Sequence, residues 1–107
     1  MLILASKSKS RQDLLDAAGV EFKSVSAGID EDAVKRDMRE RGQDSRQTSL
    51  RLATQKAMVV SEKYPNAFVI GADQILDLNG EWFSKPADLN IAHKHLKKLR
   101  NKSHLLV

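Results

Sequence analysis

Short apolar runs bounded by polar or turn-forming residues mark the candidate strands of this chain. They occupy residues 1–5, 20–26, 67–72, 75–78, 81–83 and 105–107. Residues 1–5 and 67–72 are continuously apolar, which is typical of buried strands. Asn79 and Gly80 form a strong signal for a two-residue hairpin, so the segments on either side of them are expected to pair.

A first helix is expected after the first strand. Ser8 or Ser10 can accept hydrogen bonds from the free backbone amides at its start. Ser10 and Asp13 have the spacing of a capping box, and Gly19 is a suitable left-handed stop. The apolar stripe of this helix would consist of Leu14, Leu15 and Ala18.

Two further helices are expected over residues 48–63 and 89–99, because apolar residues recur in both at helical spacing. The stripe of the first consists of Leu50, Ala53, Ala57 and Val60, and that of the second of Leu89, Ala92, Leu96 and Leu99. The two alanines would let a neighbouring element approach closely, and Asp88 is the expected cap of the second helix. Residues 30–44 are highly charged and weakly periodic, which indicates a loop with a short exposed helix.

Strands that alternate with helices predict an α/β fold. We expect one domain over residues 1–107, without internal repeats. The last apolar segment reaches the final residue with no polar tail or turn, so we expect a truncated form of a longer fold.

Composition narrows the class of protein. The chain is 41% hydrophobic and 30% charged, which is ordinary for a soluble globular protein and too apolar for a disordered one. No run approaches the roughly 18 apolar residues of a membrane helix, and the N-terminus lacks the basic region of a signal peptide. The absence of cysteine excludes disulfides, thiolate metal sites and cysteine nucleophiles. We therefore expect a cytoplasmic protein with no membrane partner.

The net charge of +4 suits either nucleic acid or an anionic small molecule. The basic residues are dispersed along the chain and only 5% of all residues are aromatic, which is poor material for a base-stacking platform. A nucleic-acid partner is therefore not expected, and most of the basic residues are interpreted as solvated.

The segment at residues 6–11 follows a strand and opens a helix. This position directs backbone amides and the helix dipole at one point, where an anion can bind. The hydroxyls of Ser6 and Ser8 add donors, and Arg11 can hold phosphate oxygens bidentately. A plain helix cap among solvated lysines explains the same pattern, and the local sequence favours that simpler interpretation.

Asp73 ends the second continuously apolar run. Ligands of open α/β sheets gather at the carboxyl ends of strands, where a carboxylate can hold a divalent metal or accept a proton from water. Gln74 lies beside it and can recognise the edge of a ligand. An aspartate that only caps a turn is equally compatible with the pattern.

Three further residues are weaker candidates. Lys56 flanks the apolar stripe of its helix, and Lys85 precedes a proline after the hairpin, so each is a candidate phosphate contact. The acidic residues 30–32, which include Glu31, can supply the oxygen ligands that Mg²⁺ prefers. Taken alone, each is more simply a solvated surface group.

Five short motifs follow one another along the chain. They are Leu4-Ala5-Ser6-Lys7-Ser8-Lys9-Ser10-Arg11, Ile29-Asp30-Glu31, Leu52-Ala53-Thr54-Gln55-Lys56-Ala57, Gly71-Ala72-Asp73-Gln74 and Lys85-Pro86. In this order they resemble the Maf family of nucleotide pyrophosphatases, also known as septum formation inhibitor proteins. His104 also lies near a position where the family usually has histidine. Each motif is weak alone, but the ordered set spans essentially the whole chain.

The resemblance implies an α/β fold with a mixed sheet flanked by helices, similar to the inosine-triphosphatase-like architecture of the family. It implies hydrolysis of a nucleoside triphosphate to the monophosphate and pyrophosphate, with Mg²⁺ or Mn²⁺ as cofactor. Asp73 would accept the proton of the attacking water, and Glu31 would join it in metal binding. The triphosphate would be held by Ser6, Ser8, Arg11, Lys56 and Lys85.

Substrate specificity stays open at this point. The pair Asp73-Gln74 resembles the 7-methyl-GTP branch of the family, but Ser10 stands at a specificity position where other branches have Trp or Arg. Ser84 replaces the glycine that is usual before Lys-Pro. Family members are close to twice this length, so the chain would correspond to the N-terminal half. Such a half would leave an apolar surface that a second copy, forming a homodimer, is able to cover.

Two other functions compete with an enzyme. A catalytically impaired nucleotide-binding fragment, or a regulatory protein of the septum-formation-inhibitor kind, would bind its ligand without turnover. A basic nucleic-acid module would instead lose affinity steeply as salt rises.

Overall fold

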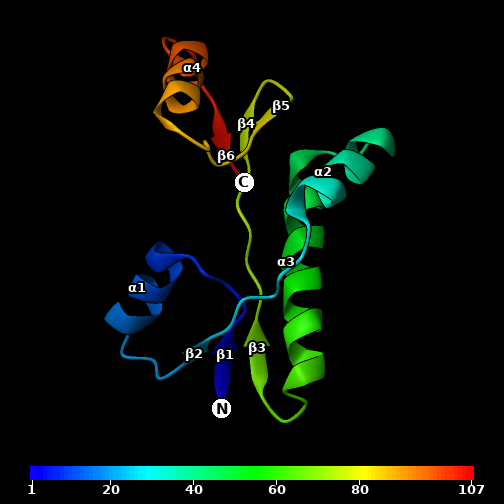
Figure 1. The fold of residues 1–107 in the computed structure, drawn as a ribbon, viewed down its shortest axis with the longest axis vertical. Coiled ribbons are helices and arrows are strands. Elements are labelled where there is room, and N and C mark those ends of the chain that lie inside the picture. Colours follow the sequence, from blue (N-terminus) through cyan, green and yellow to red (C-terminus); the bar gives the residue numbers. More distant parts are fainter.

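The computed structural model describes residues 1–107 and contains two small sheets at opposite ends of the molecule (Figure 1). The parallel sheet, in the order β2-β1-β3, consists of β1 (Leu2–Leu4), β2 (Lys23–Ser24) and β3 (Phe68–Ile70). The antiparallel sheet, in the order β5-β4-β6, consists of β4 (Leu76–Leu78), β5 (Glu81–Phe83) and β6 (Leu105–Leu106). The helices are α1 (Lys9–Ala17), α2 (Glu31–Glu40), α3 (Ser45–Lys63) and α4 (Leu89–Leu99).

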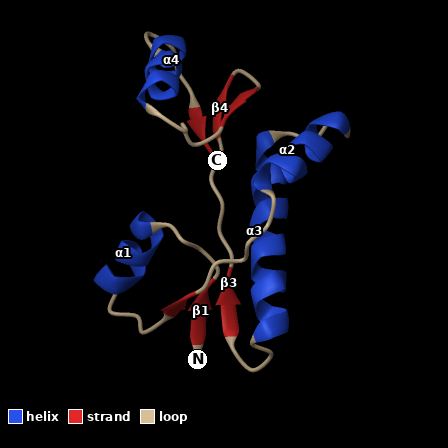
Figure 2. Cartoon of the chain, in the orientation of Figure 1, coloured by secondary structure: helices blue, strands red, loops and turns tan.

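The expected α/β class is confirmed, with the parallel and antiparallel pairings divided between the two sheets. A single extended stretch of chain leads from β3 to β4 and so connects them (Figure 2). None of the helices is long and apolar enough to cross a membrane.

The core lies between the parallel sheet and α3. β1 is the central strand, and its residues Ile3 and Leu4, together with Ala5 directly after it, are buried as the continuous apolar run predicts. Ile3 and Ala5 form one cluster with Val60 of α3, against which Val69 of β3 is packed. The carboxyl ends of β1 and β3 therefore meet at the same edge of the sheet, where the chain turns toward the second sheet.

α3 approaches the chain after β3 unusually closely. The Cβ of an alanine at Gly71 would lie 2.0 Å from the carbonyl oxygen of Ala53 and 2.9 Å from the Cβ of Ala57. The expectation that the two alanines permit a close approach is thus confirmed. The buried face of the helix differs from the predicted one, because Leu50 is 67% exposed whereas Leu52 is fully buried.

The first helix and its following strand differ from the expected pattern. α1 is capped by Ser8, one of the two predicted caps, whose side chain accepts from the backbone amide of Arg11, whereas the predicted Ser10 box does not form. Gly19 has the left-handed φ of +72° expected of a stop. Leu14 is 71% exposed because α1 projects away from the sheet and buries none of its residues. Residues 20–26 contribute only the two-residue strand β2.

Two further predictions of burial are wrong. Phe68 is 79% exposed, since β3 is an edge strand and only alternate residues face α3. α4 begins after the predicted cap Asp88, but Leu89 and Leu96 are largely exposed and no residue of this helix is buried. In the charged segment, the expected short exposed helix is present as α2, which has ten residues, is capped by Asp30 and buries none of its side chains.

The antiparallel sheet is attached to the helices by polar contacts. The predicted hairpin forms at Asn79 and Gly80, both of which have positive φ. Asp77 of β4 accepts hydrogen bonds from the Gly80 amide at 2.7 Å and from the Ser45 hydroxyl of α3 at 2.6 Å. The guanidinium of Arg39 in α2 lies 4.6 Å from the ring centre of Trp82. These contacts fix the second sheet over the ends of α2 and α3.

The variant Gly71→Ala is expected to lower the free energy of unfolding by about 3 kcal/mol or more, because the added Cβ meets backbone that cannot move aside cheaply. Chemical denaturation measures this loss. The control Gly19→Ala introduces left-handed strain without a clash, since nothing lies within 4 Å of its Cβ, and should cost about 1–2 kcal/mol. A smaller loss for Gly71→Ala than for Gly19→Ala would contradict the close packing.

Candidate active site

A cleft of about 1230 Å³ opens between the two sheets. Its volume exceeds the roughly 300–1,000 Å³ typical of small-molecule pockets, so a nucleotide-sized ligand has room. Every site residue predicted from the sequence contributes to its lining. They are Ser6, Ser8, Ser10, Arg11, Glu31, Lys56, Asp73, Gln74 and Lys85. The structure thus brings together candidates from five separate segments of the chain.

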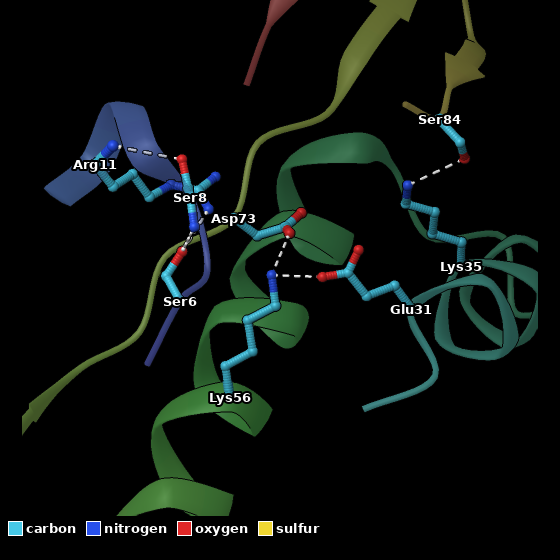
Figure 3. Close-up of polar contacts among 8 residues, drawn as sticks. All are labelled: Ser6, Ser8, Arg11, Glu31, Lys35, Lys56, Asp73 and Ser84. Carbon is cyan, nitrogen blue, oxygen red and sulfur yellow. Dashed lines mark hydrogen bonds and ion pairs between the residues drawn. The ribbon is translucent and has the colours of Figure 1, made fainter. Parts of the chain in front are cut away.

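Lys56 lies at the centre of this cleft. It projects from α3, and only 10% of its side chain is exposed. Its Nζ lies 2.6 Å from Oε1 of Glu31, in the first turn of α2, and 2.9 Å from Oδ1 of Asp73 (Figure 3). One ammonium therefore holds together three segments that are distant in sequence.

The charge of Lys56 depends on these two carboxylates. Burial acts to lower the pKa of the ammonium, because desolvation penalises its charged form. The hydrogen bonds and charges of Glu31 and Asp73 outweigh that effect and raise the pKa above its ordinary 10.5. Lys56 is therefore a fixed positive charge at neutral pH, and it is already compensated by its two partners.

Asp73 has one oxygen to spare. Its side chain is only 7% exposed, and Oδ1 accepts the Lys56 hydrogen bond, but Oδ2 is buried without any hydrogen-bond partner. Buried polar atoms are nearly always satisfied, so an orphan oxygen in a cleft indicates a place for a ligand, water or ion. The residue follows β3 at the carboxyl edge of the parallel sheet, where the sequence predicts a ligand site.

The N-terminus of α1 forms another part of the lining. Ser6, which is 6% exposed, accepts hydrogen bonds from the amide of Ser8 at 3.0 Å and from the guanidinium of Arg11 at 3.3 Å. Ser8 is at the same time the helix cap. The helix cap predicted here is confirmed, and the capped end of α1 lines the cleft together with Arg11, so anion binding at this end stays a prediction.

The remaining candidates are less constrained. Ser10, Gln74 and Lys85 are all exposed at the cleft, and no side-chain hydrogen bond holds any of them. Lys35 of α2 is among the lining residues that the sequence interpretation did not single out. It stands four residues after Glu31 and so shares its side of the helix. That spacing was a usable signal, because the sequence already indicated a short exposed helix in this charged segment.

Glu31 and Asp73 are the residues able to hold a metal. The structure contains no group of three or more His, Asp or Glu residues close enough to bind an ion. Mg²⁺ is often held by only one or two carboxylates, with water and substrate phosphates as the other ligands. Two converging carboxylates, one with an unpartnered oxygen, fit that kind of site.

The variant Lys56→Met is expected to lower the free energy of unfolding by about 3 kcal/mol, because it leaves the buried Asp73 carboxylate without its partner. Adding Asp73→Asn to this variant removes the stranded charge and should restore at least about 1 kcal/mol. Denaturant unfolding of both single variants and the double variant measures this coupling. Losses that simply add would show that the ion pair does not stabilise the fold.

Comparison with known proteins identifies the family. The family model described as "Maf-like protein" matches residues 1–107. A nucleoside triphosphate pyrophosphatase of Granulibacter bethesdensis is 43% identical over 99% of this chain and 54% of its own length. A 7-methyl-GTP pyrophosphatase of Brucella abortus is 48% identical over 98% and 53%, respectively.

A third relative, a nucleoside triphosphate pyrophosphatase of Hyphomonas neptunium, is 50% identical over 96% of this chain and 52% of its own. The chain spans about half the length of these curated relatives, which confirms the expectation that family members are close to twice as long. With a match along its whole length and relatives at this level of identity, the chain belongs to the Maf family.

Proposed function

We propose that this protein hydrolyses a nucleoside triphosphate to the monophosphate and pyrophosphate. The observation that carries the proposal is the unpartnered Oδ2 of Asp73, buried beside Lys56 in a cleft that is also lined by the capped N-terminus of α1. The names of the relatives support the same reaction class. A hydrolase needs both a proton acceptor and a place for the phosphates, and the proposal assigns these roles to Asp73 and to the N-terminus of α1.

Asp73 is the proposed proton acceptor. A water molecule beside Oδ2 gives its proton to that oxygen as it attacks the α-phosphorus. A phosphorus–oxygen bond forms, the anhydride bond between the α- and β-phosphates breaks, and pyrophosphate leaves with the bonding electron pair. Lys56 is the proposed positioning residue. Its hydrogen bond to Oδ1 orients the Asp73 carboxylate and leaves Oδ2 without a partner.

The triphosphate charge is the main electrostatic demand on the site. Lys56 contributes little net charge, since two carboxylates surround it. Neutralisation is therefore assigned to Arg11, to Lys85 and to the backbone amides at the start of α1, with Ser6 and Ser8 as additional donors. When bound by Glu31 and Asp73, Mg²⁺ or Mn²⁺ would supply further positive charge at the phosphate oxygens.

The nucleobase would be selected by the exposed residues Ser10 and Gln74, which line the cleft without internal partners. The pair Asp73-Gln74 and the Brucella relative favour 7-methyl-GTP as one substrate to test. These two residues do not by themselves distinguish one nucleobase from another, so a panel of nucleotides has to be tested.

Nucleotide binding without turnover is a second candidate. Both carboxylates, Glu31 and Asp73, are engaged by Lys56, which leaves Asp73 with one free oxygen for proton transfer. The chain also spans only about half the length of its relatives. Both observations favour binding without turnover. In that case the cleft would hold the nucleotide but not break it.

Pyrophosphate release in the presence of Mg²⁺ or Mn²⁺, measured over a panel that includes 7-methyl-GTP, tests the enzyme. Asp73→Asn should lower the rate at least about 100-fold, since a positioned base contributes that much, and should still be thermally stabilised by nucleotide. Asp37→Asn is the control, because Asp37 pairs with Arg41 on the exposed side of α2 and does not line the cleft. Thermal stabilisation of the unmodified chain without any pyrophosphate release would favour the binding function instead.

A further inference from the structure

Lys35 is a cleft residue to which the proposed reaction assigns no role. It lies in the middle of α2, is half-buried and lines the cleft. Its Nζ donates a hydrogen bond of 3.3 Å to the hydroxyl of Ser84, in the segment that follows β5 (Figure 3). The contact joins α2 to the chain that carries the next residue, Lys85.

The ammonium of Lys35 has no acidic partner. Every ion pair of the structure involves other basic residues, namely Lys9, Arg41, Lys56 and Lys98. Two of these, Lys9 and Lys56, also line the cleft, so their charges are already compensated where a polyphosphate would bind. Lys35 contacts only a neutral hydroxyl and therefore keeps its full charge for a ligand.

Exchange of this hydroxyl for a phosphate oxygen is favourable. A hydrogen bond between an ammonium and an anionic oxygen is about twice as strong as one to a neutral group. Lys56 has a third N–H to donate, but its charge is already compensated by two carboxylates, so it attracts a polyanion less strongly. Lys35 loses little when it changes partner, because the Ser84 hydroxyl that it releases is exposed and can bond to water.

The position of Lys35 complements that of Arg11. In the close-up, Arg11 and its serines lie on one side of the Lys56–Asp73 pair, and Lys35 with Ser84 lies on the other (Figure 3). Ser84 and Lys85 both line the cleft, so this second wall presents two lysines without carboxylate partners. A polyphosphate at Asp73 would thus have cationic groups on both sides.

We propose that Lys35 is a further phosphate-binding residue, which exchanges the Ser84 hydroxyl for an oxygen of the substrate's polyphosphate. This inference rests on the proposed function in one respect, because it takes the cleft as the place where a polyphosphate binds. It adds the wall opposite α1 as a second phosphate contact and gives α2 a direct role in substrate binding.

Binding of inorganic tripolyphosphate to the complete chain, measured by calorimetry without metal, tests the inference. Lys35→Met should weaken binding about tenfold, in line with the loss of one charged hydrogen bond. Lys35→Arg should keep most of the affinity. Arg36→Met is the matched control, since it removes a neighbouring charge that does not line the cleft, and should leave binding nearly unchanged.

Ser84→Ala separates phosphate binding from a structural role. If Lys35 binds phosphate, removal of the hydroxyl frees the ammonium and affinity stays the same or rises slightly. If the Lys35–Ser84 contact only fixes the hairpin, Ser84→Ala weakens binding as much as Lys35→Met does, which would overturn the inference. An equal effect of Lys35→Met and Arg36→Met would also overturn it.

The same series distinguishes this inference from the proposed activity. Loss of affinity in Arg11→Met but not in Lys35→Met keeps the phosphate cleft and refutes the role of Lys35. Lys35-dependent binding of tripolyphosphate without any pyrophosphate release from nucleotides supports the role of Lys35 and refutes the hydrolase. Failure of the unmodified chain to bind tripolyphosphate overturns the role of Lys35 and leaves the proposed phosphate cleft without support.

Discussion

The burial of one ammonium between two carboxylates is the interaction on which this structure depends most. Lys56 joins α3 to the first turn of α2 through Glu31 and to the end of β3 through Asp73. An ammonium with 10% of its side chain exposed is costly to leave unpaired, so the three segments must meet for the chain to fold as it does. Their meeting also forms the floor of the cleft.

The same interaction organises the charge of the proposed site. The two carboxylates compensate the charge of Lys56, the most buried basic residue, and one buried oxygen of Asp73 stays free. The proposed proton acceptor and the proposed phosphate contacts are therefore different groups. The cations without carboxylate partners lie to either side, with Arg11 on α1 and Lys35 on α2. A polyanion can therefore enter without displacing the ion pair that supports the fold.

Much of this arrangement could be predicted from the sequence, because strand ends and helix starts place ligand-binding residues at common edges. The position of Asp73 after an apolar run and the cap at Ser8 are examples. The buried face of α3 could not be predicted in the same way, since one side of that helix faces a polar cleft. Leu52 and Lys56 are buried, whereas Leu50 is exposed. The partners of Lys56 are equally hidden, because they depend on tertiary contacts among residues far apart in sequence.

The most direct test of this account is an NMR titration of the complete chain with an α,β-methylene nucleoside triphosphate, which cannot be cleaved at the proposed bond. We predict that amide signals of residues 6–11, the first turn of α2, Lys56 and Asp73 shift together and give one dissociation constant. Shifts confined to the lysine-rich α4, or separate dissociation constants for these segments, would contradict a single site organised around Lys56.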